Sequence, residues 1–166
     1  MKRNKYIGIL MLAATMFGAA SCTDYSDYNT VPVDSRAEAN STLWENIVSD
    51  PQLTKFAALA KQCNFSEALN SSRFYTVWAP ADNAISDTEF NRLMASDSAT
   101  IVKQFIQQHI TEYNHPVSDA LDATTIISLN LKHHQFTKES FDEFPYIATN
   151  LPATNGVMHK IDGYSV

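Results

Sequence analysis

The sequence predicts an α+β fold, because most of its helical patterns precede most of its strand patterns. Apolar residues recur at helical spacing through residues 43–63, whereas apolar, aromatic and β-branched residues dominate 73–79 and 157–161. The chain has 166 residues, 45% of them hydrophobic, which is enough for one domain with a packed core. We therefore expect helices near the N-terminus that pack on a layer of short strands.

The first 22 residues are interpreted as a lipoprotein signal. Three basic residues precede an apolar run over residues 6–20, which is shorter than the ~20 residues that a transmembrane helix needs. The segment Ala19–Cys22 is similar to a bacterial lipobox, in which the cysteine is diacylated and becomes the mature N-terminus. We expect residues 1–21 to be removed and Cys22 to carry lipid. The alternative is ordinary secretion with Cys22 as a plain thiol.

Residues 22–40 are expected to form the lipidated cysteine and an acidic, flexible tether, because they lack helical or strand periodicity. Removal of residues 1–21 leaves nine basic against 18 acidic residues, a formal charge of −9. Asp24 and Asp27 resemble the acidic signals that direct some lipoproteins of Gram-negative bacteria to the outer face. We expect a membrane-anchored lipoprotein of the outer membrane that faces either the cell surface or the periplasm.

The folded part begins with two helix signals. Thr42 and Glu45 have the spacing of a capping box, which predicts a short helix after Thr42. Asp50-Pro51 supplies an N-cap and a first-turn proline for a second helix, which is expected to end near Asn64. Cys63 lies on the apolar face of that helix and is predicted to be a buried, inert thiol.

The next strand pattern has no charged residue after its first position. Residues 73–79 are aromatic and β-branched, which predicts a central strand covered on both faces, and Pro80 ends it. Ser86 and Glu89 again fit a capping box, and helical spacing resumes between Ser98 and Ile110.

Two later segments are predicted to be strands. Leu129 and Leu131 alternate with polar residues, as in a half-exposed strand. Val157–Ile161, between two turn signals, is expected to be the last strand.

Two segments then carry a family likeness. Residues 75–85 (YTVWAPADNAI) and 153–166 (ATNGVMHKIDGYSV) resemble the two signature boxes of the fasciclin domain. The resemblance implies a fasciclin-like domain over residues 41–166, with N-terminal helices packed on a β-sandwich or wedge of short strands. The residues of the boxes are expected to build the core and its turns: Thr76, Trp78, Pro80, Asp82, Asn155, Gly156, His159 and Asp162.

The resemblance also implies a candidate ligand-binding region. Gln108-His109 falls at the tyrosine-histidine motif of the family, with glutamine in place of tyrosine. In related adhesive domains this region is implicated in receptor contact, so Gln108, His109 and the nearby Tyr113 are the ligand-binding candidates. The alternative for His109 is a hydrogen-bonded residue of the core or its boundary.

Several functional classes are disfavoured by the sequence. The formal charge of −6, with no basic cluster beyond the first five residues, excludes a nucleic-acid-binding surface. We find no nucleophile elbow, phosphate-binding loop or His-Glu-x-x-His motif, so we expect neither an enzyme nor a cofactor. His133-His134 suggests a metal ligand pair, but adjacent strand residues point to opposite faces, so we expect no metal site.

The function implied by the resemblance is adhesion. We expect a cell-surface lipoprotein binding module that contacts matrix proteins, glycans or other cells. The alternative is a structural accessory subunit of an outer-membrane uptake or assembly complex. Because related proteins often continue with further domains, the sequence is also compatible with a fragment of a longer protein.

Overall fold

The computed structural model describes residues 39–96 and 99–165. The expected signal peptide, the lipid attachment at Cys22 and the tether up to residue 38 lie outside these residues, and they stay predictions. Within the described residues, no helix has the length and apolar character that a membrane-spanning helix requires.

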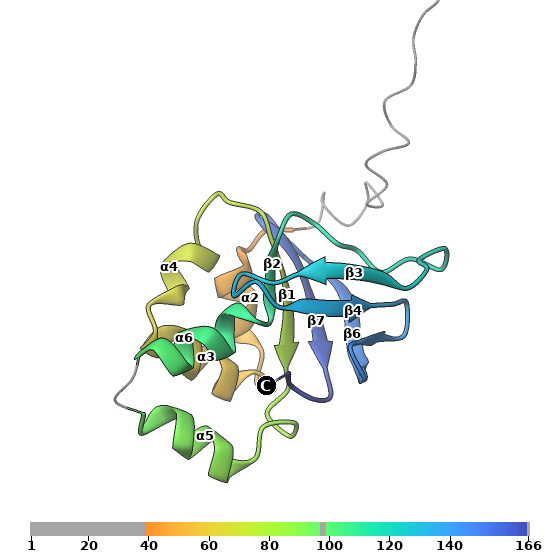
Figure 1. The fold of residues 1–166 in the computed structure, drawn as a ribbon. Helices are drawn as coiled ribbons and strands as arrows, with labels where there is room; N and C mark the ends of the chain where they lie inside the picture. The colour runs from red at the N-terminus through yellow and green to blue at the C-terminus, as the bar shows by residue number, and fades with distance from the viewer. Residues whose placement is uncertain (1–38, 97–98, 166) are drawn as a thin grey trace, which may run out of the picture. The chain divides into compact units, whose positions relative to one another are not determined.

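The described helices gather on one side of strands β1 and β7 (Figure 1). In chain order they are α2 (Leu43–Ser49), α3 (Thr54–Gln62), α4 (Phe65–Leu69), α5 (Asp87–Met94) and α6 (Ala99–Gln107).

Two of these helices begin where the sequence predicted. The Thr42 hydroxyl accepts the backbone N–H of Glu45, and the Glu45 carboxylate accepts the backbone N–H of Thr42, which confirms the capping box of α2. Before α5, the Ser86 hydroxyl accepts the backbone N–H of Glu89 at 3.1 Å. In both cases a side chain satisfies an N–H group that has no partner inside the helix.

The predicted start of the second helix is wrong. Asp50-Pro51 belongs to a turn, and α3 begins at Thr54. The carboxylate of Asp82 accepts two N–H groups at the start of α3. The Thr54 N–H donates to Oδ2 at 3.2 Å, and the Lys55 N–H donates to Oδ1 at 2.8 Å. A residue 28 positions away therefore supplies the cap, which local sequence patterns do not reveal. The short helix α4 after Asn64 was also not predicted.

The described strands form one mixed sheet in the order β2-β1-β7-β6-β5-β4-β3. Their bounds are β1 Tyr75–Pro80, β2 Ile110–Glu112, β3 Thr124–Ile127, β4 His133–Phe136, β5 Ser140–Phe141, β6 Phe144–Ala153 and β7 Gly156–Ile161. β1 runs antiparallel to β2 and parallel to β7, and every residue of β1 is buried. The predictions of a covered interior strand and of a last strand over 157–161 are confirmed.

β1 separates two hydrophobic cores. Tyr75, Val77 and Ala79 contribute to the core beneath the helices. Trp78 points the other way, into a second core with Phe136 and Phe141 from the β4–β5 region. Alternate residues of one strand thus face opposite cores, which explains why every residue of the strand is buried.

The predicted strand through Leu129 and Leu131 is wrong, because these residues lie in a tight turn between β3 and β4. Leu129 packs against the helix-side core, whereas Leu131 is 79% exposed. The turn is closed by the Ser128 N–H, which donates to the Lys132 carbonyl at 2.9 Å. Alternation of apolar and polar residues therefore arises here from a turn with one inward and one outward leucine.

Cys63 is less enclosed than predicted. It is a free cysteine of intermediate burial at the C-terminus of α3. Burial raises the pKa of its thiol, which keeps the less reactive protonated form. The predicted full burial of Cys63 is therefore wrong, and its inertness stays a prediction.

Candidate functional site

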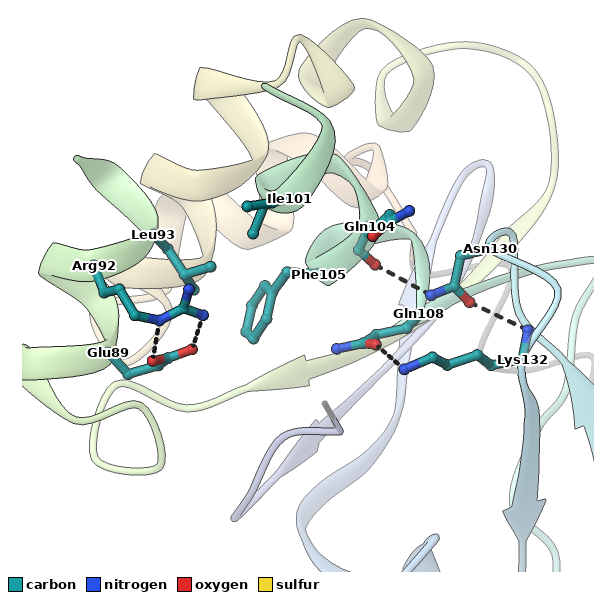
Figure 2. Close-up of a pocket in the computed structure, with 9 residues that line it drawn as sticks. All are labelled: Glu89, Arg92, Leu93, Ile101, Gln104, Phe105, Gln108, Asn130 and Lys132. Carbon is teal, nitrogen blue, oxygen red and sulfur yellow. Dashed lines mark hydrogen bonds and ion pairs between the residues drawn. The ribbon is translucent and has the colours of Figure 1, made fainter. Parts of the chain in front are cut away.

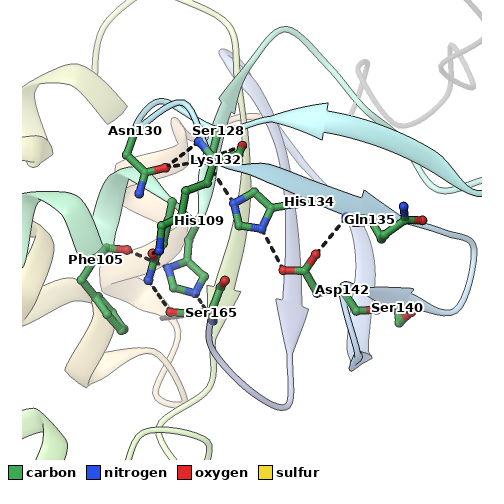
Figure 3. Close-up of polar contacts among 11 residues, drawn as sticks. Phe105, His109, Ser128, Asn130, Lys132, His134, Gln135, Ser140, Asp142 and Ser165 are labelled. Atoms are coloured by element: carbon green, nitrogen blue, oxygen red, sulfur yellow. Dashed lines mark hydrogen bonds and ion pairs between the residues drawn. The ribbon is translucent and has the colours of Figure 1, made fainter.

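Gln108 and His109 both hydrogen-bond the backbone of Ser165. Figure 3 shows the contact between His109 and Ser165. The two residues follow α6 directly, and they are 4% and 0% exposed. The Gln108 side-chain amide donates to the Ser165 carbonyl. His109 Nε2 accepts the Ser165 N–H at 3.1 Å. The candidate pair is therefore occupied by another part of the same chain.

The hydrogen bonds of His109 fix its tautomer. Nδ1 lies 2.7 Å from the Phe105 carbonyl, which only accepts, so Nδ1 carries the proton and Nε2 is the acceptor. Burial lowers the pKa of His109 to about 4, so the ring is neutral at pH 7. Because the residue is fully buried, it presents no surface to a partner in this structure. Its geometry is that of the hydrogen-bonded core alternative.

Tyr113 differs from the other two candidates, because its side chain is 72% exposed. Its φ angle of 67° is unusual for a bulky residue. The backbone is held in place on both sides, since the Tyr113 N–H donates to the Phe74 carbonyl at 3.0 Å and the Tyr113 carbonyl accepts the Thr76 hydroxyl at 2.7 Å. A fixed backbone therefore presents an aromatic side chain to solvent.

A pocket of about 280 Å³ lies between α5, α6 and the turn after β3 (Figure 2). Leu93 and Phe105 supply apolar surface, and Gln108 lies at one side. Opposite Gln108, Arg92 donates to both carboxylate oxygens of Glu89 at 2.8 and 2.7 Å. Lys132 donates to the Gln108 side-chain oxygen at 3.3 Å. The pocket thus combines an apolar surface with polar groups on two sides.

Near His109, three residues align in the order of a catalytic triad (Figure 3). Asp142 Oδ2 lies 2.8 Å from His134 Nδ1, and His134 Nε2 lies 3.1 Å from Ser128 Oγ. However, Ser128 is only 4% exposed, and its hydroxyl lies 2.6 Å from Asn130 Oδ1. The hydroxyl is therefore not accessible to a substrate. The hydrogen bonds of His134 instead connect the turn after β3 with the β4–β5 hairpin. His133 and His134 point to opposite faces, as the sequence predicted, with His133 exposed.

Asn155 connects three parts of the helix-side core. Its side-chain oxygen accepts the Leu43 N–H at 2.8 Å, and its amide donates to the carbonyls of Leu69 and Ser71 at 2.9 and 2.7 Å. Gly156 follows with φ 155°, and a Cβ placed there would lie 1.9 Å from the Tyr75 carbonyl oxygen. The second signature box thus needs these two residue types for structure.

His159 and Trp78 lie together in the strand-side core, with ring centroids 5.8 Å apart. His159 accepts the Asn150 N–H at 3.2 Å and donates to the His115 carbonyl at 3.0 Å. Burial lowers the pKa of His159 to about 4, so it also stays neutral. The His115 N–H donates to Thr76, another residue of the first signature box.

The remaining signature residues lie at the end of the sheet where β1 and β7 stop. Pro80 ends β1, and Asp82 caps α3. Asp162 accepts the Asn83 amide at 3.1 Å. Across residues 39–96 and 99–165, no group of three or more His, Cys, Asp or Glu side chains is arranged to hold a metal ion.

A family model, the fasciclin domain, matches residues 51–164 of this chain. The chain belongs to the fasciclin domain family. Fasciclin domains are non-catalytic modules for adhesion and binding. The fold and the signature boxes are therefore those that the sequence resemblance implied.

Two proteins illustrate the similarity. Mouse stabilin-1 is 22% identical over 145 residues, a match that covers 80% of this chain and 6% of stabilin-1. A fasciclin (FAS1) domain pair from the insect cell adhesion molecule fasciclin I superposes with a TM-score of 0.59 at 16% identity, covering 77% of this chain and 51% of the other. The chain therefore spans a small part of stabilin-1 and about half of the insect domain pair.

Sequence reasoning did not reveal the partners of the candidate residues. Ser165 contributes only backbone groups to Gln108 and His109, and such groups leave no sequence signal. Asp142, which hydrogen-bonds His134, lies directly after β5 and has a φ angle of 52°. Aspartate tolerates this left-handed conformation, which is the one local signal that could have marked the position.

Proposed function

We propose that this fasciclin domain is the binding module of a cell-surface lipoprotein, and that it contacts matrix proteins, glycans or other cells through the surface around Tyr113. One observation carries the proposal. Tyr113 is the exposed member of the three candidate residues, and its backbone is fixed by Phe74 and Thr76. A rigid, exposed aromatic side chain is a frequent energetic anchor of protein interfaces.

The membrane part of the proposal rests on the sequence. The basic and apolar start, followed by Ala19–Cys22, supports lipid attachment at Cys22 and anchorage in the outer membrane, facing the surface or the periplasm. Mass spectrometry of the mature protein tests this step. A diacylated N-terminal Cys22 supports it, whereas an unmodified N-terminus at another residue contradicts it.

Attachment assays test the binding function. Beads coated with the domain are applied to surfaces of matrix proteins and of neutral polysaccharides, and Tyr113→Ala is compared with the wild type. Val48→Ala is the matched control, because Val48 is also exposed, at 52%, but lies on α2. We expect Tyr113→Ala to lose attachment and Val48→Ala to keep it. Equal attachment by all three proteins, on every surface that the wild type binds, would contradict the assigned surface.

The acidic character of the mature chain limits its partners. With a formal charge of −9 after removal of residues 1–21, anionic surfaces are repelled within a Debye length of about 8 Å at physiological salt. Neutral glycans and basic protein patches are therefore the favoured partners. Attachment to a basic partner is expected to weaken as salt is added.

A structural accessory subunit of an outer-membrane uptake or assembly complex is the second candidate. It would be favoured if the anchored protein, isolated from intact cells, carries one stoichiometric membrane-protein partner and if Tyr113→Ala does not release it.

A further inference from the structure

We propose that Asn150 is a positioning residue for the proposed binding surface: it holds residues 113–117 against the sheet and thereby fixes how Tyr113 is presented to a partner. The inference rests on the proposed function. It adds a determinant of affinity that acts through other residues and not by touching the partner.

Asn150 lies at an irregularity of β6. From Ala148 to Leu151 this strand advances by three residues, while its partner β7 advances by two, between Lys160 and Met158. One residue of β6 is therefore extra, which makes the irregularity a β-bulge. Asn150 has a φ angle of 55°, a left-handed conformation that asparagine tolerates. Bulges redirect side chains and are frequent next to functional sites.

The side chain of Asn150 binds the backbone of Val117 twice. Its Oδ1 accepts the Val117 N–H at 2.8 Å, and its Nδ2 donates to the Val117 carbonyl at 2.7 Å. The backbone N–H of Asn150 donates to Nδ1 of His159 at 3.2 Å. The side-chain amide thus pairs with both backbone groups of one residue, as a neighbouring strand would. We call this pair of hydrogen bonds the Val117 clamp.

Three neighbouring strands hold alternate residues of the segment 113–117. Thr76 of β1 donates to the Tyr113 carbonyl at 2.7 Å and accepts the His115 N–H at 2.9 Å. His159 of β7 donates to the His115 carbonyl at 3.0 Å. The Val117 clamp on β6 holds the last residue. Because the sheet has the order β1-β7-β6 here, the segment is attached to one strand after another.

Tyr113 depends on these attachments, because its own backbone conformation is unfavourable. Its φ angle of 67° is rare for a bulky residue, and such conformations persist only where the surrounding structure holds them. Without the Val117 clamp, one end of the segment is released. A partner then has to order the segment when it binds, which weakens its apparent affinity. Loss of the Asn150 side chain should therefore weaken binding although no contact with the partner is removed.

Glycine at position 150 separates the clamp from the backbone conformation. Asn150→Gly removes both hydrogen bonds to Val117, and glycine adopts the left-handed conformation readily. Leu131→Gly is the matched control, because Leu131 also has a left-handed φ, 67°, but lies in the turn after β3. Ser128→Ala removes hydrogen bonds of a buried hydroxyl in the same turn and controls for a loss of stability alone.

Two properties of the mature chain are measured below the melting temperature of every variant. Nuclear magnetic resonance gives the order parameter of the Tyr113 N–H and the exchange rate of the Val117 N–H, and surfaces coated with collagen or dextran give apparent dissociation constants. We expect Asn150→Gly to lower the order of Tyr113, to accelerate exchange at Val117 and to bind at least about threefold more weakly. Leu131→Gly and Ser128→Ala should match the wild type in both properties.

A Tyr113 that stays as ordered in Asn150→Gly as in the wild type overturns the proposal. Binding that follows the melting temperature of the variants, and not the order of Tyr113, also overturns it. If Tyr113→Ala loses binding but Asn150→Gly keeps it, only the positioning role is wrong. If Tyr113→Ala binds like the wild type, the proposed binding surface is wrong, and the role in affinity falls with it. The relaxation measurement needs no ligand, so it tests the positioning even where the wild type binds neither surface.

Discussion

The His109 ring and the Ser165 backbone, 56 residues apart, are joined by a hydrogen bond of 3.1 Å from the Ser165 N–H to Nε2. This contact brings the end of the described chain to the position where related domains have their tyrosine-histidine motif. Since Gln108 binds the Ser165 carbonyl as well, both candidate residues act as an internal clamp. Of the three candidate residues, Tyr113 is the exposed one.

The stability of the domain should fall as the pH is lowered from 7.5 to about 4. His109 and His159 have a pKa of about 4 in the folded protein, against 6.5 for an unperturbed histidine. The unfolded state therefore takes up protons first, and the free energy of unfolding decreases between about pH 6.5 and pH 4 before it levels. Above pH 6.5 this contribution is fully present.

Urea unfolding at pH 7.5, 6, 5 and 4.5 measures this effect. Unperturbed carboxyl groups titrate near pH 4, so a loss that begins above pH 5.5 belongs to the histidines. Val48→Ala, an exposed substitution that removes no titratable group, is the control and should leave the pH dependence unchanged. Equal free energies of unfolding at pH 7.5 and 4.5 would contradict the buried, neutral histidines.

Trp78→Ala should destabilise the domain by about 3–5 kcal/mol, as expected for removal of a large buried aromatic side chain. Trp78 is 1% exposed and stacks on Phe141 with ring centroids 4.7 Å apart. Denaturant unfolding followed by circular dichroism gives the value. Trp78→Phe should lose much less, and an unchanged midpoint for Trp78→Ala would place the residue outside the core.

Asn155→Ala should cost about 3 kcal/mol or more. The substitution leaves the Leu43 N–H and the carbonyls of Leu69 and Ser71 without their partner, and each buried unpaired group costs about 1–3 kcal/mol. Asn91→Ala, on the exposed side of α5, is the control and should change stability by less than about 0.5 kcal/mol. Similar effects of the two substitutions would show that Asn155 does not connect the helices to the sheet.

Ser128 should not react with a fluorophosphonate, a reagent that labels serine nucleophiles. Although His134 lies 3.1 Å from its hydroxyl, Ser128 is 4% exposed and its hydroxyl faces Asn130. Mass spectrometry after incubation with excess reagent should therefore find no adduct. Ser128→Ala should instead lower stability by about 1 kcal/mol, the contribution of a typical hydrogen bond. An adduct on Ser128 would refute the structural role.

The fold was predictable where local patterns and the family resemblance agreed. The capping box at Thr42 and the covered strand β1 are set by residues close together in the sequence. Errors occurred where a distant residue decides the structure. Asp82 caps α3 from 28 positions away, so the predicted start at Asp50-Pro51 was wrong. A second error had a local cause, because the turn at Leu129–Leu131 has the same alternation of apolar and polar residues as a strand.

The candidate site was predictable only as a region. The resemblance directed attention to Gln108, His109 and Tyr113, but the difference between them is their exposure, which depends on tertiary packing. Neither the clamp on Ser165 nor the pocket beside Gln108 has a sequence motif, because the first uses backbone groups and the second combines three separate segments.

The division of roles between His109 and Tyr113 is tested most directly by measuring melting temperature and bead attachment for His109→Ala and Tyr113→Ala side by side. His109→Ala should lower the melting temperature, because it removes a fully buried side chain that binds Phe105 and Ser165. Tyr113→Ala should keep the melting temperature within error and lose attachment. An unstable Tyr113→Ala, or a His109→Ala variant that stays as stable as the wild type but no longer attaches, would contradict the account.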